Sequence, residues 1–298
     1  MTSLNSRQLG DVDCRLKKPV EVGCISRDEQ GQIRFDRSQL KCIVDDVCTG
    51  QVPDKVDLND GYKDRYKQQE ELIGLDKMLR WMLENRDRFY LPDSGPKEGV
   101  ENIIGEYPDF VAWRSNFSKI LYAPFDTRES WRIECQKLHK TIYMCTVGIT
   151  PKCDSRSEPE SKKPESESDS ESEDEIDPLE RLDFWGQRFK SYMTRPFSSP
   201  NEKKPIVDQK TVVVDQHQQF HSVLFSNLNQ RHSLLYGSRI DCCDPSLEPP
   251  DCYIDLRTNR VFSSRRQEEN FYRHKVKYMC IIVNFVCVLF LLFVVNNS

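Results

Sequence analysis

The tract at residues 153–175, CDSRSEPESKKPESESDSESEDE, limits what this chain can fold into more than any other feature. Segments this polar and acidic bury too little apolar surface to offset the entropy lost on ordering. We therefore expect a disordered loop inserted into a folded unit. Its Ser-x-x-Glu spacings would suit an acidophilic kinase, but charge runs of this kind more often serve only as solvated loops.

The acidic tract also explains much of the chain's charge. The net charge is −5 and 31% of the 298 residues are charged, with the excess concentrated in the tract. The remaining residues are roughly balanced or slightly basic, which permits nucleic-acid binding without arguing for it. The length allows one large domain or two small ones.

The 12 cysteines could suggest a disulfide framework. However, the N-terminal stretch MTSLNSRQLGDVDCRLKK contains no apolar segment of a secretory signal, so we expect reduced thiols. No C-x2-C pair occurs, and Cys242, Cys243 and Cys252 lie too close to strand patterns to indicate a zinc knuckle. We therefore do not expect a structural zinc site.

Hydrophobic periodicity predicts a mixture of strands and helices. Residues 1–66 alternate short apolar runs with turn residues, which is typical of strands and loops. Helical spacing predicts an amphipathic helix over 68–88, and capping residues with an N-terminal proline predict another over 177–193. Residues 110–121 fit either a strand or a helix. The remaining expected elements are strands at 131–136, 141–149, 220–228, 234–241 and 252–258, the first two forming a hairpin.

The stretch CYIDLRT, residues 252–258, combines a buried-strand pattern with two charged residues. Side chains alternate along a strand, so Asp255 and Arg257 share one face with Tyr253, while Ile254 and Leu256 take the other. A carboxylate and a cation side by side on one strand face suggest a functional strand, such as the metal strand of a nuclease.

The C-terminal residues 278–295, YMCIIVNFVCVLFLLFVV, form an apolar run preceded by Arg273, His274, Lys275 and Lys277. A helix of that length spans roughly 27 Å, near the hydrocarbon thickness of a bilayer. Hydropathy therefore predicts a candidate transmembrane tail anchor with the basic flank in the cytoplasm. The alternative is a buried helix and strand of a larger domain.

Several stretches, in this order, resemble the DXO family of RNA decapping nucleases. They are DLNDGYKDRY with the helix LDKMLRWMLENR, PDFVAWRSNFSKIL, WGQRFKSYM, LLYGSRIDCCDP, CYIDLRT and FYRHKV. The resemblance covers most of residues 20–277 apart from the acidic insert. It implies an α+β fold, a mixed two-sheet core flanked by helices and related to PD-(D/E)xK nucleases.

The resemblance also implies a chemistry. Family members remove incomplete caps from RNA 5′ ends and degrade the 5′-monophosphate RNA in the 5′-to-3′ direction. Carboxylates are needed because Mg²⁺ or Mn²⁺ takes oxygen ligands and can clamp the attacking and leaving oxygens at phosphorus. A neighbouring lysine can stabilise the developing charge.

The positions that match the family's catalytic motifs depart from this pattern. The glutamate of the helix motif is replaced by Lys190 in GQRFK, and the glutamate of the next motif by Arg239 in RID. That motif keeps Asp241, while the strand motif has Asp255 and Arg257 in place of glutamate and lysine. Three cations now face two carboxylates, whereas the family pattern has four carboxylates and one lysine.

We therefore expect this pocket to repel a divalent cation, because reversed charges in a partly buried site cost several kcal/mol. Any metal would be held weakly, by Asp241 and Asp255. Arg114 in AWRSNF matches the family's arginine that faces the RNA 5′ phosphate, and Lys190, Arg239 and Arg257 could join it in a phosphate clamp. Alternatively, these cations only form salt bridges with Asp241 and Asp255.

These patterns lead to three functional hypotheses. The first is an RNA 5′-end-binding relative with lost or strongly reduced decapping and exoribonuclease activity. The second is an active nuclease that recruits metal through other carboxylates, such as Asp244 or Glu248. The third is a membrane-tethered scaffold. Family resemblance further suggests a 5′-3′ exoribonuclease partner and a location in nucleus and cytoplasm, while the apolar tail suggests membrane contact. After FYRHK the family continues with a further helix and strands, so we expect a C-terminally truncated domain over 1–277.

Overall fold

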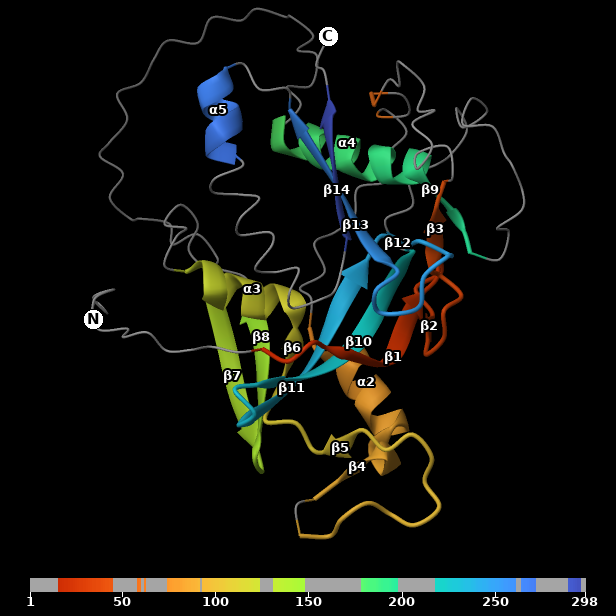
Figure 1. Cartoon of the computed structure of the whole chain (residues 1–298), viewed down its shortest axis with the longest axis vertical. Helices are drawn as coiled ribbons and strands as arrows, with labels where there is room; N and C mark the ends of the chain where they lie inside the picture. The colour runs from red at the N-terminus through yellow and green to blue at the C-terminus, as the bar shows by residue number, and fades with distance from the viewer. Residues whose placement is uncertain are drawn as a thin grey trace, which may run out of the picture.

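The computed structural model describes residues 16–44, 58–59, 62, 74–91, 93–123, 131–147, 178–197, 218–260, 264–271 and 289–295. These residues form two mixed β-sheets with helices against them (Figure 1). The expected α+β class, with a mixed two-sheet core flanked by helices, is therefore confirmed.

The larger sheet has seven strands within the described residues and mixes parallel with antiparallel pairs. Its core is the hairpin of β10 and β11, which pairs with β1 on one side and β6 on the other. In spatial order the strands are β2 (Ile33–Arg34), β1 (Val20–Arg27), β10 (Gln219–Leu228), β11 (His232–Ile240), β6 (Phe110–Trp113), β8 (Thr141–Val147) and β7 (Arg132–Leu138).

The smaller sheet has five strands among the described residues and holds the CYIDLRT stretch in its strand β13. The strands in spatial order are β14 (Leu289–Val295), β13 (Tyr253–Arg260), β12 (Cys242–Cys243), β3 (Lys41–Ile43) and β9 (Thr194–Pro196). The expected alternation is observed, since Ile254 and Leu256 pack in one apolar cluster and Tyr253 in another. Because only Asp241 separates β11 from β12, the chain passes directly from one sheet to the other at the RID stretch, residues 239–241.

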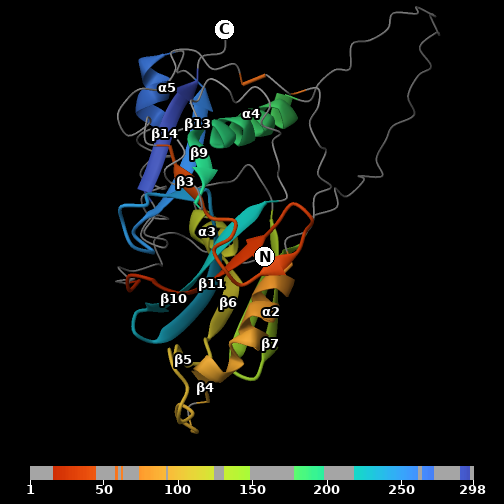
Figure 2. The ribbon, with the colours of Figure 1, turned by 90° about the vertical axis from the view of Figure 1, so that its right-hand side faces the viewer.

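One helix packs against the larger sheet and another against the smaller sheet (Figure 2). Helix α2 packs Met78, Trp81 and Met82 against residues of the larger sheet, and α4 packs Phe189 and Met193 against β13. The helical segments are α2 (Asp76–Glu84), the 3₁₀ turn η2 (Arg86–Arg88), α3 (Arg114–Tyr122), α4 (Pro178–Met193) and α5 (Arg265–Asn270).

A polar network centred on the buried Glu21 carboxylate joins the two sheets. Arg37 Nη2 donates to Glu21 Oε1 over 2.8 Å, and Ser222 Oγ donates to Glu21 Oε2 over 3.0 Å. The Tyr253 hydroxyl also donates to Glu21 Oε2. Glu21 and Ser222 belong to the larger sheet and Tyr253 to the smaller one, so these bonds fix how the two sheets meet. Burial and the Glu21 charge raise the pKa of Tyr253, which keeps its hydroxyl a donor.

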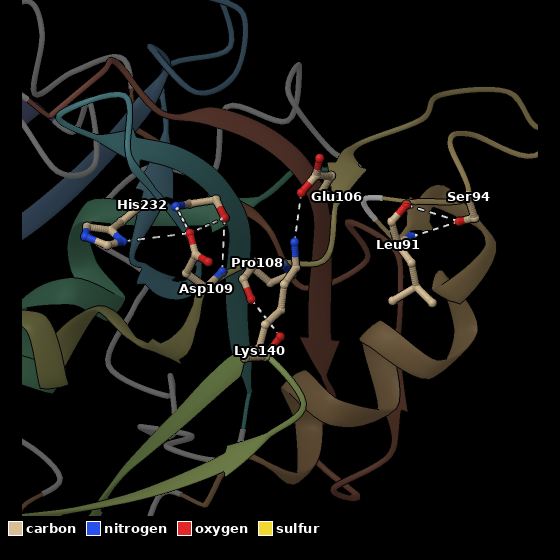
Figure 3. A network of polar contacts seen from close by, with 9 residues as sticks. Leu91, Ser94, Glu106, Pro108, Asp109, Lys140 and His232 are labelled. Carbon is tan, nitrogen blue, oxygen red and sulfur yellow. Dashed lines mark hydrogen bonds and ion pairs between the residues drawn. The ribbon is translucent and has the colours of Figure 1, made fainter.

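A second polar network fixes the start of β6 between its two parallel neighbours (Figure 3). Asp109 Oδ2 accepts from Ser233 N at 2.8 Å, and the Asp109 amide donates to Ser233 O at 3.0 Å. Ile142 N donates to Asp109 O at 2.8 Å, which ties β8 to the same residue. Lys140 Nζ donates to Glu106 Oε2 at 2.8 Å beside it. These contacts fix the point at which β6 begins between β11 and β8.

Several expected elements are confirmed and others need new bounds. The expected hairpin is present as β7 and β8, with 148–149 outside the described residues, and so are the helix ending at Met193 and the strands at 220–228, 234–241 and 252–258, whose observed bounds differ by one or two residues. The described part of the helix expected over 68–88 is only Asp76–Glu84, and 68–73 lie outside the described residues. Residues 110–121 contain both a strand and a helix, because β6 ends at Trp113 and α3 begins at Arg114.

The C-terminal apolar run also differs from the expected helix. Leu289–Val295 forms β14, which pairs in parallel with β13 along seven residues. The preceding residues 278–288 and the acidic insert 153–175 lie outside the described residues. Among the described residues, no helix is both long and apolar enough to cross a bilayer.

Candidate functional site

Helix α4 carries Lys190 to the junction of the two sheets. Lys190 Nζ donates to Asp241 Oδ1 at 2.8 Å, and the other oxygen, Asp241 Oδ2, accepts from Leu256 N at 2.9 Å. The side chain of Asp241 is 7% exposed and that of Lys190 is 20% exposed. Both oxygens of Asp241 are thus engaged by this chain's own donors.

An asparagine from a separate loop fastens α4. Asn59 Oδ1 accepts from Arg181 Nη2 at 2.8 Å and from Trp185 Nε1 at 3.0 Å. In the same stretch, the Tyr62 ring packs edge-on against Phe184 with centroids 5.1 Å apart. Asn59 and Tyr62, in the stretch DLNDGY, therefore position the helix that carries Lys190.

Asp255 on β13 lies between two arginines. Arg257 Nη2 donates to Asp255 Oδ2 at 2.9 Å, and Arg257 Nε lies 2.9 Å from Asp255 Oδ1. Arg114 is the first residue of α3, and its Nη2 donates to Asp255 Oδ2 at 3.5 Å. The other terminal nitrogen, Arg114 Nη1, is buried and has no acceptor among the described residues. Asp255 is therefore paired by charge, although its buried Oδ1 accepts no hydrogen bond among the described residues, and Arg114 keeps one donor unused.

The two carboxylates respond to these neighbours in opposite directions. Burial acts to raise the pKa of Asp241, but the Lys190 ammonium and the hydrogen bonds outweigh it, so the net pKa lies below the usual aspartate value. Burial and the neighbouring charge of Asp241 raise the pKa of Asp255 despite Arg257 and Arg114. The two groups thus behave as one coupled pair embedded in cations.

Arg239 behaves differently from the other predicted cations. It is exposed on β11, and no ion pair or hydrogen bond of its side chain is found with the described residues. Its cross-strand neighbour on β10 is His221, and directly opposite residues of an antiparallel pair share one face of the sheet. The structure therefore brings Lys190, Asp241, Asp255, Arg257 and Arg114 together and leaves Arg239 beside them, free to meet a ligand.

His221 and Trp113 are neighbours of the site that the sequence did not reveal. The His221 ring is 6% exposed and lies against the Trp113 ring with centroids 4.9 Å apart. Burial, followed by the charges of Lys77, Arg239, Arg114 and Arg27, lowers the pKa of His221 to about 3. The histidine within an apolar strand pattern could have marked His221 as a site residue. Its position opposite Arg239 depends on the strand register, which the sequence does not give.

This set of donors does not fit a divalent metal. Magnesium and manganese need several oxygen ligands free to coordinate, yet both carboxylates here already hold cations at 2.8–2.9 Å. Among the described residues, no group of three or more histidine, cysteine, aspartate or glutamate side chains is arranged to hold a metal ion. Asp244 Oδ1 accepts from Ser246 Oγ at 2.6 Å within its own turn.

Comparison with protein families and curated proteins gives consistent matches. The family model described as RAI1-like PD-(D/E)XK nuclease matches residues 17–280. A human protein named decapping and exoribonuclease protein is 33% identical over 267 residues, which cover 87% of this chain and 58% of that protein. The protein of that name from Xenopus laevis is 30% identical, with 88% and 60% covered. The chain spans about three fifths of the length of these relatives.

Solved structures confirm the PD-(D/E)xK nuclease-like fold. Candida albicans Rai1 in complex with pU5 and Mn²⁺ superimposes with a TM-score of 0.70 at 17% identity, covering 95% of this chain and 70% of that one. Scheffersomyces stipitis Rai1, solved with 3′-NADP⁺ and a calcium ion, gives a TM-score of 0.66 at 16% identity, with 95% and 72% covered. At such identities the likeness concerns the fold alone.

Proposed function

The chain belongs to the RAI1-like PD-(D/E)XK nuclease family, and from this premise we propose that it binds RNA 5′ ends without a metal ion. We further propose that its metal-dependent decapping and 5′-3′ exoribonuclease activities are lost or strongly reduced. The observation that carries the proposal is the Lys190–Asp241 ion pair, with Nζ and Oδ1 2.8 Å apart where the family motifs place two carboxylates.

Electrostatics supports the loss of metal binding. A divalent cation would have to displace Lys190 from Asp241 and Arg257 from Asp255 before either carboxylate could coordinate it. After each displacement, an ammonium or guanidinium group would lie close to the incoming cation. Like charges repel strongly in a partly buried site. We therefore infer that Mg²⁺ or Mn²⁺ binds here weakly or not at all.

Two guanidinium groups support the phosphate contact. Arg114 Nη1 is a buried donor without an acceptor among the described residues, and a buried unused donor costs free energy that an anionic oxygen can recover. Arg239 adds an exposed cation, and its charge acts on His221 together with that of Arg114. Arginine pairs with phosphate oxygens through its planar fork of donors. The ligand that suits both groups is the 5′ phosphate of an RNA strand.

The proposal is tested by measuring binding and turnover on the same RNA. We expect the chain to bind 5′-monophosphorylated RNA more tightly than 5′-hydroxyl RNA in EDTA, by fluorescence anisotropy. We expect no nucleotide release from the phosphorylated RNA when Mg²⁺ or Mn²⁺ is added. Metal-dependent nucleotide release that is abolished by Asp241→Ala would instead establish an active nuclease. Equal affinity for the two RNAs would show that the chain does not recognise the 5′ phosphate.

A charge-reversal variant tests the reason for the lost metal site. Lys190→Glu with Arg239→Glu restores the carboxylates of the family pattern, and we expect calorimetry to detect Mn²⁺ binding that the unmodified chain lacks. A matched control, Arg86→Glu with Arg231→Glu, makes the same charge change on exposed residues elsewhere and should bind no Mn²⁺. No gain in the reversal variant would mean that the geometry of the site, and not only its charge, differs from that of the family.

The proposal includes the compartments suggested by the resemblance, nucleus and cytoplasm. A fluorescent fusion with and without residues 278–298 tests this together with the candidate membrane anchor. Equal distribution of both fusions between nucleus and cytosol is expected. Retention of only the longer fusion in a carbonate-resistant membrane fraction would favour the tethered scaffold.

A further inference from the structure

Strand β7 is an open edge of the larger sheet (Figure 1). It is seven residues long, and six of these are exposed and the other half-buried. On its outer side, no strand of the described residues pairs with it. The strand contains no proline and no bulge against β8. A straight edge of this length presents a row of backbone donors and acceptors that can pair with another strand.

We propose that two copies of this chain associate through antiparallel pairing of β7 with β7 of the partner. A two-fold axis perpendicular to the sheet makes the strands antiparallel and keeps the same face of both sheets on the same side. Under this symmetry, one residue lies opposite its own copy. Whether the two sheets join depends on which residue that is.

The charges of β7 exclude some registers, and the number of paired residues selects among the rest. Pairing centred on Glu134 or on Lys137 places like charges directly opposite one another, which is destabilising. Pairing centred on Cys135 is the register that joins all seven residues, because Cys135 is the middle residue of the strand. It places Glu134 opposite Gln136, Ile133 opposite Lys137 and Arg132 opposite Leu138, so no like charges meet.

The side chains of this register suit an interface between identical copies. Ile133 can cover the aliphatic stem of Lys137 from the partner copy, and Leu138, which is 57% exposed, can cover the stem of Arg132. Cys135 is an exposed free thiol that would face its own symmetry mate. Because the contact is a single pair of strands, we expect a weak dimer that depends on concentration.

Two variants at one position test the register by charge alone. Ile133→Glu places a carboxylate opposite Lys137 of the partner twice in each dimer, and Ile133→Lys places an ammonium there. Both remove the same apolar side chain, so each controls for the other. Sedimentation equilibrium should show the unmodified chain associating reversibly towards twice its 35.0 kDa, with the dissociation constants of the two variants differing about tenfold, Glu being tighter.

Thiol cross-linking tests the same register without altering the strand. A short bifunctional maleimide should link two chains through Cys135 on both, as mapped by mass spectrometry. Cys135→Ser should abolish the cross-linked dimer, and Cys145→Ser on the neighbouring strand β8 should not. A monomer at every concentration, equal shifts for both Ile133 variants, or cross-links through other cysteines would each overturn the proposal.

Discussion

At the residue scale, the Lys190–Asp241 pair balances a nearly buried carboxylate with a cation of the same chain. The Asp241 carboxylate is nearly buried, and its charge is balanced by one ammonium and one backbone N–H group. A buried carboxylate that loses its cation keeps the desolvation cost without the compensating attraction. This residue pair should therefore contribute to the stability of the fold as well as to the charge of the site.

Lys190→Met tests this contribution. We expect the free energy of unfolding in urea at pH 7 to fall by about 3 kcal/mol, because Asp241 is left charged and unpaired. The double variant Lys190→Met with Asp241→Asn removes both charges and should recover most of the loss. If the single variant unfolds at the same urea concentration as the unmodified chain, water already screens the pair and the carboxylate remains available to other ligands.

His221 makes stability depend on pH. Burial and the surrounding cations lower its pKa from the ordinary 6.5 to about 3. The unfolded chain therefore binds the proton more tightly than the folded one, and stability is lost as the pH falls below 6.5. Between pH 6.5 and pH 5 we expect a loss of about 2 kcal/mol from this residue.

The measurement compares urea unfolding of the unmodified chain and of His221→Phe at both pH values. The phenylalanine keeps an aromatic ring beside Trp113 and cannot be protonated. Contributions from the other histidines and the carboxylates cancel in the difference between the two proteins. Parallel pH profiles would show that His221 is protonated in the folded state and that the cations around it are farther away than the structure places them.

At the element scale, close contact between α2 and the larger sheet depends on glycine. A Cβ added to Gly237 on β11 would lie 2.2 Å from the Trp113 ring and 2.8 Å from Met78. Neither buried neighbour can move without disturbing the cluster that holds α2 against the sheet. Gly186 in α4 is the opposite case, because the nearest atom to an added Cβ is Thr258 Oγ1 at 3.9 Å.

The two glycines give a matched pair of variants. Gly237→Ala should lower the free energy of unfolding by about 2 kcal/mol through overpacking. Gly186→Ala should raise it by about 0.5–1 kcal/mol, because alanine loses less conformational freedom in a helix interior. Thermal and urea unfolding measure both. A neutral Gly237→Ala would mean that Trp113 has room to shift, which would also move Arg114 and its contact with Asp255.

The elements were largely predictable because their patterns are local. Alternation gave β10, β11 and β13, and capping residues gave α4, since these signals involve residues close in sequence. Residues 110–121 were ambiguous for a physical reason, because a strand passes into a helix at Trp113–Arg114 and the segment carries both periods. The ordering of Leu289–Val295 beside β13 depends on a partner strand about 35 residues earlier, which no local pattern reveals.

The clustering of these charged residues was predictable from the sequence, but their pairings were not. Motif resemblance located Lys190, Asp241, Asp255, Arg257 and Arg114, and the structure brings these five together. Sequence left open whether the cations would pair with the aspartates or stay free for phosphate. The structure gives a divided answer: Lys190 and Arg257 are paired, while Arg239 is exposed and Arg114 retains an unused donor.

At the scale of the whole molecule, the pairing of some site cations with aspartates limits how strongly the chain can bind a polyanion. The net charge of the chain is −5, so long-range attraction to RNA is weak and binding depends on local cations. Of the four cations at the site, Lys190 and Arg257 are held by the carboxylates at 2.8–2.9 Å, whereas Arg114, 3.5 Å from Asp255, keeps one donor unused. The phosphate contacts should therefore come from the remaining two, Arg114 and Arg239.

The salt dependence of RNA binding measures the number of phosphate contacts. Each phosphate neutralised on a single strand releases counterions and contributes about −0.7 to the slope of log K against log salt. With the unused donor of Arg114 and the exposed Arg239 as the phosphate contacts, anisotropy titrations in EDTA with 5′-phosphorylated RNA should give a slope of about −1.4. Arg239→Gln should make it less steep by about 0.7, whereas Arg231→Gln, on the turn at the far end of the same hairpin, should leave it unchanged. A slope near −2.8 in the unmodified chain would mean that RNA opens both ion pairs and recruits Lys190 and Arg257 as well, because four cations would then each meet a phosphate.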